Sequence, residues 1–336
     1  MPERFARPVV TPAADRARIE AGTVRDPRAL VSLTTDFGER DASPAICRGV
    51  ILGIAPDVRL LDVSHEVAKF AVLDGALLLW AALPYLPVGV HVAVVDPGVG
   101  TTRLPIGVRV ARGDVLVGPD NGLLLPAADR LGGVVAAHVL EAAEFRLPEV
   151  SASFHGRDVF APAGAHLALG VPLEAFGRPL DPSGLVRLRL PEPNVMPGAL
   201  VTAVIYVDSF GNVKLAGERP DLEAALGRLT YGDPLQVGPS PRERSPQEPS
   251  PQEPPQGQSP REPSLGRGRS GPHGPTRATL TWQPTFGAVP PGDPLLYEDS
   301  HGRLCLAVAQ GDAARRLELR TGDWLAIRRA PPGRAP

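Results

Sequence analysis

The segment VVDPGVGTTR, residues 94–103, places an acid and a base where they could act together. An apolar, β-branched run ends at Asp96, a Pro-Gly turn follows, and Arg103 comes seven residues after the acid. The spacing raises the question of why a carboxylate ends a strand that is expected to be buried. A second question is why the chain then places a guanidinium close to that carboxylate.

Acidic and polar side chains follow several predicted strands in the same way. They are Asp36 of TTDFG, Asp62, Ser64 and His65 of LDVSHE, Asp96, and the segment GPDNG at 118–122. In open α/β sheets, ligands bind outside the carboxyl ends of the strands, so these residues form a candidate site. The alternative is that they cap helices and form turns. We favour turns and caps for Asp62 and for Asn121-Gly122, a strong turn signal, and a functional role for Asp36 and Asp96.

Two further segments could carry functional residues. FHGRD, residues 154–158, has His155 on a loop beside Gly156, and Asp158 is well placed to cap the helix predicted to follow it. A histidine on a loop is more often a solvated surface residue, and the case for His155 rests on its charged neighbours. In YVDSFGN, residues 206–212, Asp208, Ser209 and Asn212 follow a predicted strand, and a simple turn is an equally good interpretation.

Several classes of site are not supported. His65-Glu66 begins HEVAK and lacks the second histidine of the zinc-protease helix HExxH. Neither a phosphate loop nor the GxGxxG spacing of dinucleotide sites is present. Cys47 and Cys305 have no metal-ligand or disulfide spacing, and the net charge of −2 gives no basic surface for nucleic acid. We therefore expect neither a metal nor a nucleic-acid partner.

The elements that must position these residues indicate two domains in 336 residues, of which 43% are hydrophobic. Short apolar strands at 31–35, 58–63, 91–95 and 114–117 alternate with helical patterns at 43–55, 72–86 and 158–170. This alternation is typical of a largely parallel sheet with helices on both faces. From about Leu190 the pattern changes to strands and turns. We predict an N-terminal α/β domain at 29–190 and a smaller β-barrel-like domain at 191–330.

Two segments are predicted to lie outside the folded domains. Residues 1–28 are expected to form a flexible tail. Residues 239–275 contain SPQEP twice, then SPREP, with Leu265 as the single large apolar side chain. Such a segment cannot bury enough apolar surface to offset its ordering entropy, so we predict a disordered insertion in the second domain. The alternative is a proline-rich ligand for a partner domain.

Targeting signals also bear on location. The first 20 residues mix both charge signs and lack the apolar core of a secretory signal. The most apolar stretch, residues 70–95, is interrupted by Asp74, Pro84, Pro87 and His91, which breaks any span of about 20 apolar residues. We therefore expect no membrane partner and a cytoplasmic protein.

Five motifs in this order, TTDFG, DPGVGTxR, GPDNG, FHGRD-FAP and YVDSFGN, resemble the S-adenosyl-L-methionine (SAM) hydroxide adenosyltransferase family, the SAM hydrolases. These proteins are related to SAM-dependent fluorinases and chlorinases. The resemblance covers residues 29–325 without the insertion. It implies an N-terminal α/β domain, a C-terminal β-barrel, and homotrimers that hold the substrate between subunits. It also implies attack of water on ribose C5′ of SAM, giving adenosine and methionine without a metal or organic cofactor.

The resemblance also implies roles for individual residues. Its Asp-Arg-His catalytic set falls on Asp96, Arg103 and His155. Ribose binding falls on Asp36, binding of the methionine amino group on Asp208, and adenine recognition on Asn212. Ser300 of EDSHG corresponds to a residue near the methionine carboxylate.

The catalytic set also answers the opening question. Arg103 would fix the orientation of Asp96, and His155 would complete a polar cluster that holds one water. Which of the three accepts the proton stays open at this point. Two alternatives also remain: a SAM halogenase that forms 5′-halo-5′-deoxyadenosine, and a SAM- or adenosine-binding module without turnover. A charged, water-holding cluster favours hydrolysis over both.

Overall fold

The computed structural model describes residues 29–240 and 277–331. The chain divides into two compact units, Met1–Arg189 and Leu190–Pro336, where the sequence places the division between residues 190 and 191. The predicted tail at 1–28 and nearly all of the predicted insertion at 239–275 lie outside the described residues.

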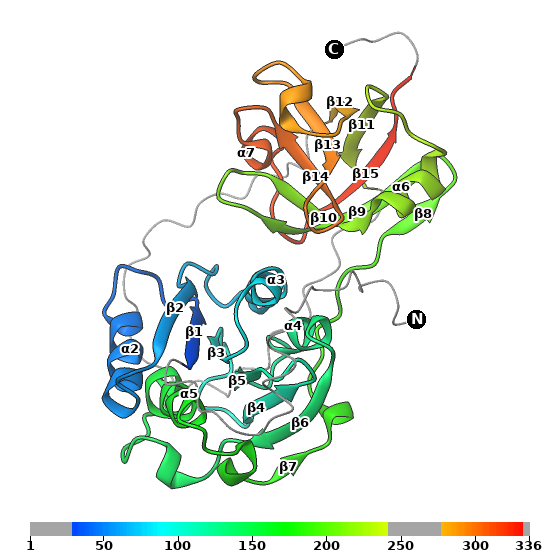
Figure 1. Ribbon diagram of the computed structural model, residues 1–336. Coiled ribbons are helices and arrows are strands. Elements are labelled where there is room, and N and C mark those ends of the chain that lie inside the picture. Colours follow the sequence, from blue (N-terminus) through cyan, green and yellow to red (C-terminus); the bar gives the residue numbers. More distant parts are fainter. Residues whose placement is uncertain (1–28, 241–276, 332–336) are drawn as a thin grey trace, which may run out of the picture. The chain divides into compact units, whose positions relative to one another are not determined.

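The first unit is built on a mixed sheet in the order β2-β1-β3-β5-β4-β6-β7 (Figure 1). The pairs β1–β2, β1–β3 and β3–β5 are parallel, and the pairs β4–β5, β4–β6 and β6–β7 are antiparallel. Its strands are β1 (Leu30–Thr35), β2 (Arg59–Ser64), β3 (Val90–Val94), β4 (Pro105–Val110), β5 (Val115–Pro119), β6 (Val134–Val139) and β7 (Pro179–Leu180).

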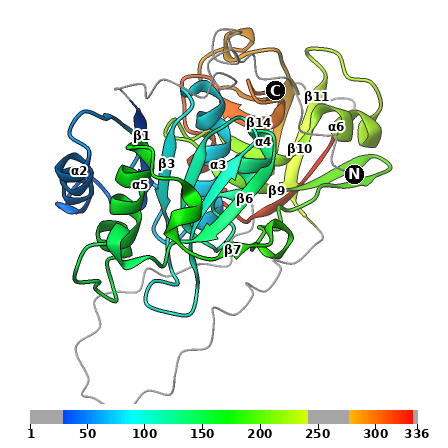
Figure 2. The ribbon, with the colours of Figure 1, turned by 60° about the horizontal axis from the view of Figure 1, so that its bottom comes forward.

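Helices cover both faces of this sheet (Figure 2). On one face α2 and α5 pack against Val31, Leu33 and Val92. On the other face α3 and α4 pack against Ala93 and Val95. Successive residues of a strand point to opposite faces of the sheet, which is why Val92 and Ala93 contact different helices. The helices of this unit are α2 (Ser43–Ile54), α3 (Val72–Ala82), η2 (Leu83–Tyr85), α4 (Leu125–Arg130), η3 (Ala143–Phe145), η4 (Gly156–Phe160), α5 (Ala161–Ala168), η5 (Leu173–Phe176) and η6 (Pro182–Gly184).

The second unit is a mixed β-barrel. Seven strands pair in the order β10-β14-β13-β12-β11-β15-β9, the additional pairing of β9 with β10 closes the ring, and β8 adds to β9. These strands are β8 (Asn194–Met196), β9 (Ala199–Val207), β10 (Val213–Glu218), β11 (Pro234–Pro239), β12 (Ala278–Trp282), β13 (Pro294–Glu298), β14 (Arg303–Val308) and β15 (Trp324–Arg329), with α6 (Arg219–Leu226), η7 (Phe286–Ala288) and α7 (Ala313–Leu317).

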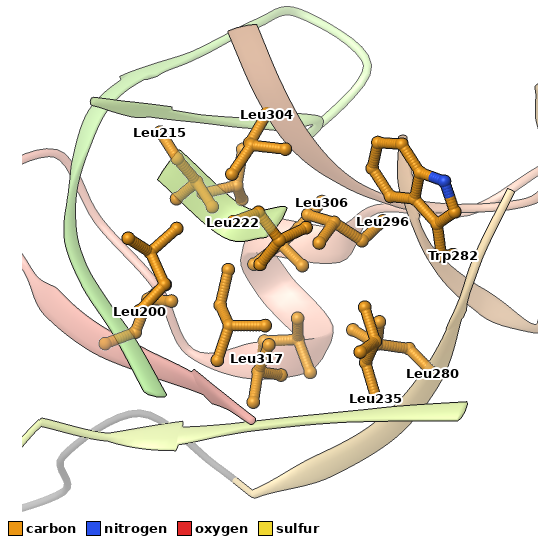
Figure 3. Close-up of a cluster of buried hydrophobic side chains, with 14 of the residues drawn as sticks. Leu200, Leu215, Leu222, Leu235, Leu280, Trp282, Leu296, Leu304, Leu306 and Leu317 are labelled. Carbon is orange, nitrogen blue, oxygen red and sulfur yellow. The ribbon is translucent and has the colours of Figure 1, made fainter. Parts of the chain in front are cut away.

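Leucines from the strands and from both α-helices fill the barrel, and Trp282 lies among them (Figure 3). Leu200, Leu215 and Leu235 are completely buried. Closing the sheet on itself removes the unpaired edges that an open antiparallel sheet would expose.

The predicted fold class is confirmed, with two differences in detail. The first sheet is mixed because β4 runs antiparallel between β5 and β6, whereas the sequence indicated a largely parallel sheet. The helical segment at 158–170 begins earlier, at Gly156, and its first turn is π-helical. Asp158 therefore lies inside the helical segment, and the prediction that it forms the N-cap is wrong; His155 occupies that position.

None of the helices in the described residues is both long and apolar enough to cross a bilayer.

Candidate active site

The ends of two parallel strands position the two aspartates to which the sequence assigns a function. β1 and β3 are neighbours, with Thr35 opposite Val94. Asp36 follows β1 directly, and Asp96 comes two residues after β3. Both aspartates therefore lie at the carboxyl edge of the parallel half of the sheet, where ligands bind in open α/β sheets.

The structure brings Asp96, Arg103 and His155 together. Arg103 Nε donates to Asp96 Oδ1 at 2.9 Å and to Oδ2 at 3.0 Å, and Arg103 Nη2 also donates to Oδ2. The same Nη2 lies 2.9 Å from His155 Nδ1. The side chains of Asp96 and Arg103 are 5% and 9% exposed, so this bidentate pair is largely shielded from water. The guanidinium thus holds the carboxylate on one side and the imidazole on the other.

One nitrogen of Arg103 remains unused. The guanidinium carbon lies 5.2 Å from the centre of the buried Phe160 ring, a cation–π distance that fixes the guanidinium plane. Arg103 Nη1 is buried and has no hydrogen-bond partner among the described residues. Because buried polar groups in proteins are nearly always hydrogen-bonded, this nitrogen is a donor available to a small ligand.

His155 lies at the start of the π-helical turn η4. Single π-turns are rare and occur often at functional sites. Burial, and then the nearby Arg103 charge, lower the pKa of His155 below its ordinary value of 6.5. Because a guanidinium can only donate, the contact with Arg103 Nη2 requires an unprotonated Nδ1. The neutral imidazole therefore carries its proton on Nε2.

Asp36 is held by the segment that precedes α3. Its Oδ2 accepts a hydrogen bond from the Phe70 N–H at 2.9 Å, and its backbone carbonyl accepts one from Lys69 Nζ. Phe70 has φ +64, uncommon for a bulky residue, and its side chain is 70% exposed. Asp36 is only 7% exposed, and its carboxylate oxygens have lone pairs that can accept hydrogen bonds from hydroxyl groups.

Asn121 supports Asp96 in a way that sequence reasoning missed. Leu123 N–H donates to Asn121 Oδ1, and Gly122 has φ +92, so the predicted turn is present. In addition, Asn121 Nδ2 donates to the Val95 carbonyl oxygen at 2.9 Å. This bond holds the residue immediately before Asp96. An Asn-Gly pair in a sequence signals a turn and gives no indication of this second contact.

In the second unit, Asp208 and Asn212 form a compact polar turn. Asp208 Oδ1 accepts from the Phe210 and Asn212 N–H groups, and Asp208 Oδ2 accepts from Asn212 Nδ2 at 2.9 Å. The turn interpretation of YVDSFGN is confirmed, and the binding roles of Asp208 and Asn212 stay predictions. Ser300 is exposed in the loop between β13 and β14, with its Oγ 3.4 Å from His301 Nδ1.

The remaining polar residues singled out in the sequence have structural partners. Asp62 lies 3.0 Å from Arg48 Nε and 3.1 Å from His65 Nε2, and His65 Nδ1 is 2.8 Å from Thr35 Oγ1. Asp158 is fully buried and accepts from the Ser151 N–H and from Arg157. Within residues 29–240 and 277–331, no three His, Cys, Asp or Glu side chains gather as metal ligands.

Two family models match the chain. The N-terminal domain model of SAM hydroxide adenosyltransferases matches residues 31–177, and the C-terminal domain model of the same family matches residues 265–326.

Known proteins resemble the chain over most of its length. A (R)-S-adenosyl-L-methionine hydrolase from Salinispora tropica is 41% identical over 90% of this chain and 98% of its own. A fluorinase from Actinopolyspora mzabensis is 30% identical, over 62% of this chain and 78% of its own. The crystal structure of an uncharacterized conserved protein from Thermotoga maritima superposes with a TM-score of 0.71, at 29% identity, over 89% of this chain and all of its own.

Proposed function

The chain belongs to the SAM hydroxide adenosyltransferase family, and we propose that Asp96, Arg103 and His155 activate the water with which it hydrolyses SAM to adenosine and methionine. The observation that carries the proposal is the hydrogen-bonded set in which one guanidinium joins the carboxylate to the imidazole.

The chemistry of the substrate explains why this set is sufficient. The sulfur of SAM carries a full positive charge and departs as a neutral thioether, so the leaving group needs no proton. The difficulty lies with the nucleophile, because water is weak and must approach C5′ in line, opposite sulfur. General-base assistance contributes about 10²–10⁴ in rate, and holding the water in line contributes further.

The hydrogen bonds assign a task to each residue. The unused Arg103 Nη1 donates to the water oxygen and stabilises the negative charge that develops there. His155 Nδ1 accepts a hydrogen bond from Arg103, so its lone pair is not available to the water. The imidazole therefore orients the guanidinium. Asp96 then accepts the proton as the carbon–oxygen bond forms, because its carboxylate retains free lone pairs.

The binding residues suit the other parts of SAM. Asp36 accepts hydrogen bonds from the ribose hydroxyls through its carboxylate. Asp208 binds the methionine ammonium group in a charge-assisted bond, Asn212 recognises adenine, and Ser300 lies near the methionine carboxylate.

We propose that the working protein is a homotrimer that holds the substrate between subunits, and that it functions in the cytoplasm. Apolar side chains exposed on α2 and β2, namely Ile46, Leu52 and Leu61, support an interface with another copy. Both cysteines are buried free thiols, which suits a reducing compartment.

The test is to incubate the purified protein with SAM in buffers with and without chloride and fluoride, and to separate the products by chromatography. Adenosine in every buffer is expected. If a 5′-halo-5′-deoxyadenosine appears only in the buffers with halide, the protein is a halogenase and the proposed hydrolysis is wrong. If SAM binds and no product forms, the protein is a binding module.

The Asp96→Ala variant separates catalysis from binding. It is expected to lower kcat by at least about 10²-fold, in the range of general-base catalysis, while SAM still binds in calorimetry. Arg109→Ala, which removes an exposed pair with Glu174, is the control and should retain full activity. Unchanged turnover in Asp96→Ala would refute the role given to the carboxylate.

A further inference from the structure

Lysine is rare in this chain. The sequence contains 35 lysines and arginines, of which two, Lys69 and Lys214, are lysines and the other 33 are arginines. Both lysines lie beside residues assigned to substrate binding: Lys69 contacts the Asp36 carbonyl, and Lys214 lies two residues after Asn212. An ammonium group is a compact point charge with three donors, whereas the guanidinium of arginine is planar and larger, so arginine replaces it only in part.

Lys214 lies on the outer surface of the barrel. Its neighbours in β10, Val213 and Leu215, are completely buried in the barrel core, so the Lys214 side chain points to the opposite side. Across the sheet it is opposite Tyr206 of β9 and Cys305 of β14. Its side chain is nevertheless only 22% exposed. A half-buried ammonium on the outside of a barrel needs a specific anionic environment.

Asp299 supplies that environment from the loop that carries Ser300. Asp299 Oδ1 accepts from the His301 and Arg303 N–H groups at 2.8 and 3.0 Å. Its Oδ2 accepts from Lys214 Nζ at 2.8 Å. The carboxylate is thus fixed by the backbone of its own loop. Although burial opposes the charged form, the hydrogen bond that Lys214 donates to Asp299 and the negative charge of that carboxylate raise the pKa of Lys214 above its ordinary value of 10.5.

From these contacts we propose that Lys214, oriented by Asp299, binds the carboxylate of the methionine portion of SAM. Nζ uses one donor on Asp299 and has no other hydrogen-bond partner among the described residues, so two donors remain for a ligand. The methionine portion is a zwitterion. The charge of Lys214 is opposite to that of its carboxylate, and the charge of Asp208 is opposite to that of its ammonium group. Ser300, which is assigned a place near the same carboxylate, directly follows Asp299 in the chain. The proposal rests on the proposed function for the identity of the substrate.

The test compares SAM with decarboxylated SAM, which lacks that carboxylate and keeps the amino group. The full chain is expected to prefer SAM in kcat/KM by about 10- to 100-fold, the effect of one charge-assisted hydrogen bond. Lys214→Met should lose this preference by raising KM for SAM, while its kcat/KM for decarboxylated SAM stays close to wild type. Lys214→Arg should restore part of the preference. Equal use of both substrates by the wild-type protein would overturn the proposal without any variant.

Arg219→Met is the matched control, because it removes a basic partner from the ion pair with Glu223 in the same unit. This variant should keep the wild-type ratio of kcat/KM for SAM to kcat/KM for decarboxylated SAM. If Lys214→Met lowers kcat/KM for both substrates equally, Lys214 has a structural role and the proposal fails. If the wild-type protein forms no adenosine, the proposed function fails, and the ratio of the two dissociation constants from calorimetry still tests Lys214.

Discussion

At the scale of single residues, the pKa of His155 makes a pH dependence testable. Burial and the Arg103 charge lower this pKa below 6.5, so the imidazole is neutral near pH 7 and Nδ1 can accept from Arg103. As the pH falls through the lowered pKa, the imidazolium loses this contact and repels the guanidinium. We expect kcat to fall in acid with a midpoint below 6.5, measured as adenosine formation against pH.

The His155→Gln variant tests which group causes that fall. Glutamine keeps a hydrogen-bond acceptor and does not titrate, so the decline below pH 6.5 should flatten. His166, in α5, also has a pKa that burial lowers, and its ring packs against Phe145 at 5.2 Å. His166→Gln is therefore the control and should keep the wild-type profile. An unchanged profile in His155→Gln would show that another group titrates.

The proposed catalytic set was accessible from sequence because its members lie in short motifs. Asp96 and Arg103 are seven residues apart in one loop, which the structure closes into an ion pair. The contact of His155 with Arg103, 52 residues away along the chain, could be inferred only through the resemblance. The Asn121–Val95 and Lys214–Asp299 bonds were not predictable, because they depend on strand pairing that periodicity does not specify.

At the scale of the elements, the four parallel strands of the first unit were predictable from short apolar runs, and β4 and β6 were not. β1, β2, β3 and β5 each lie within about two residues of a predicted strand. β4 and β6 were missed, and β4 inserts antiparallel between β5 and β6. Pro105, Gly107 and Arg109 interrupt the apolar pattern of β4, and the alanines of β6 have a low strand propensity, so the sequence signal for these two strands is weaker.

Close packing of α5 on β3 gives a prediction for these elements. A Cβ added to Gly164 would lie 2.5 Å from Val92 Cγ2, and valine is too stiff at χ1 to move aside. We expect Gly164→Ala to lower the free energy of unfolding by about 1–3 kcal/mol, the effect of overpacking. Since α5 continues from the turn that begins after His155, kcat should fall as well. Urea unfolding followed by circular dichroism measures the first effect.

Gly49 in α2 provides the opposite case. A Cβ there meets nothing within 4 Å. Because alanine is the better helix former, Gly49→Ala should raise the free energy of unfolding by up to about 1 kcal/mol. Equal destabilisation by the two substitutions would contradict the packing argument for Gly164 and the helix-propensity argument for Gly49.

At the scale of the whole molecule, the proposed trimer depends on the edge of the first sheet. β2 is an end strand of that sheet, with Leu61 38% exposed, and Ile46 of α2 is 40% exposed. An exposed edge strand with apolar side chains invites association. We expect light scattering to give three times the chain mass of 35.4 kDa. Leu61→Glu should shift the mass toward a single chain, because burying an unpaired carboxylate is unfavourable.

The same variant separates assembly from folding. Leu61 is exposed in the isolated chain, so Leu61→Glu should keep the wild-type circular dichroism spectrum. If substrate is held between subunits, adenosine formation should fall with the trimer fraction and return as protein concentration rises. A wild-type mass of 35.4 kDa with full activity would mean that one chain is sufficient for the reaction. A trimer whose Leu61→Glu variant stays trimeric would place the interface on another surface.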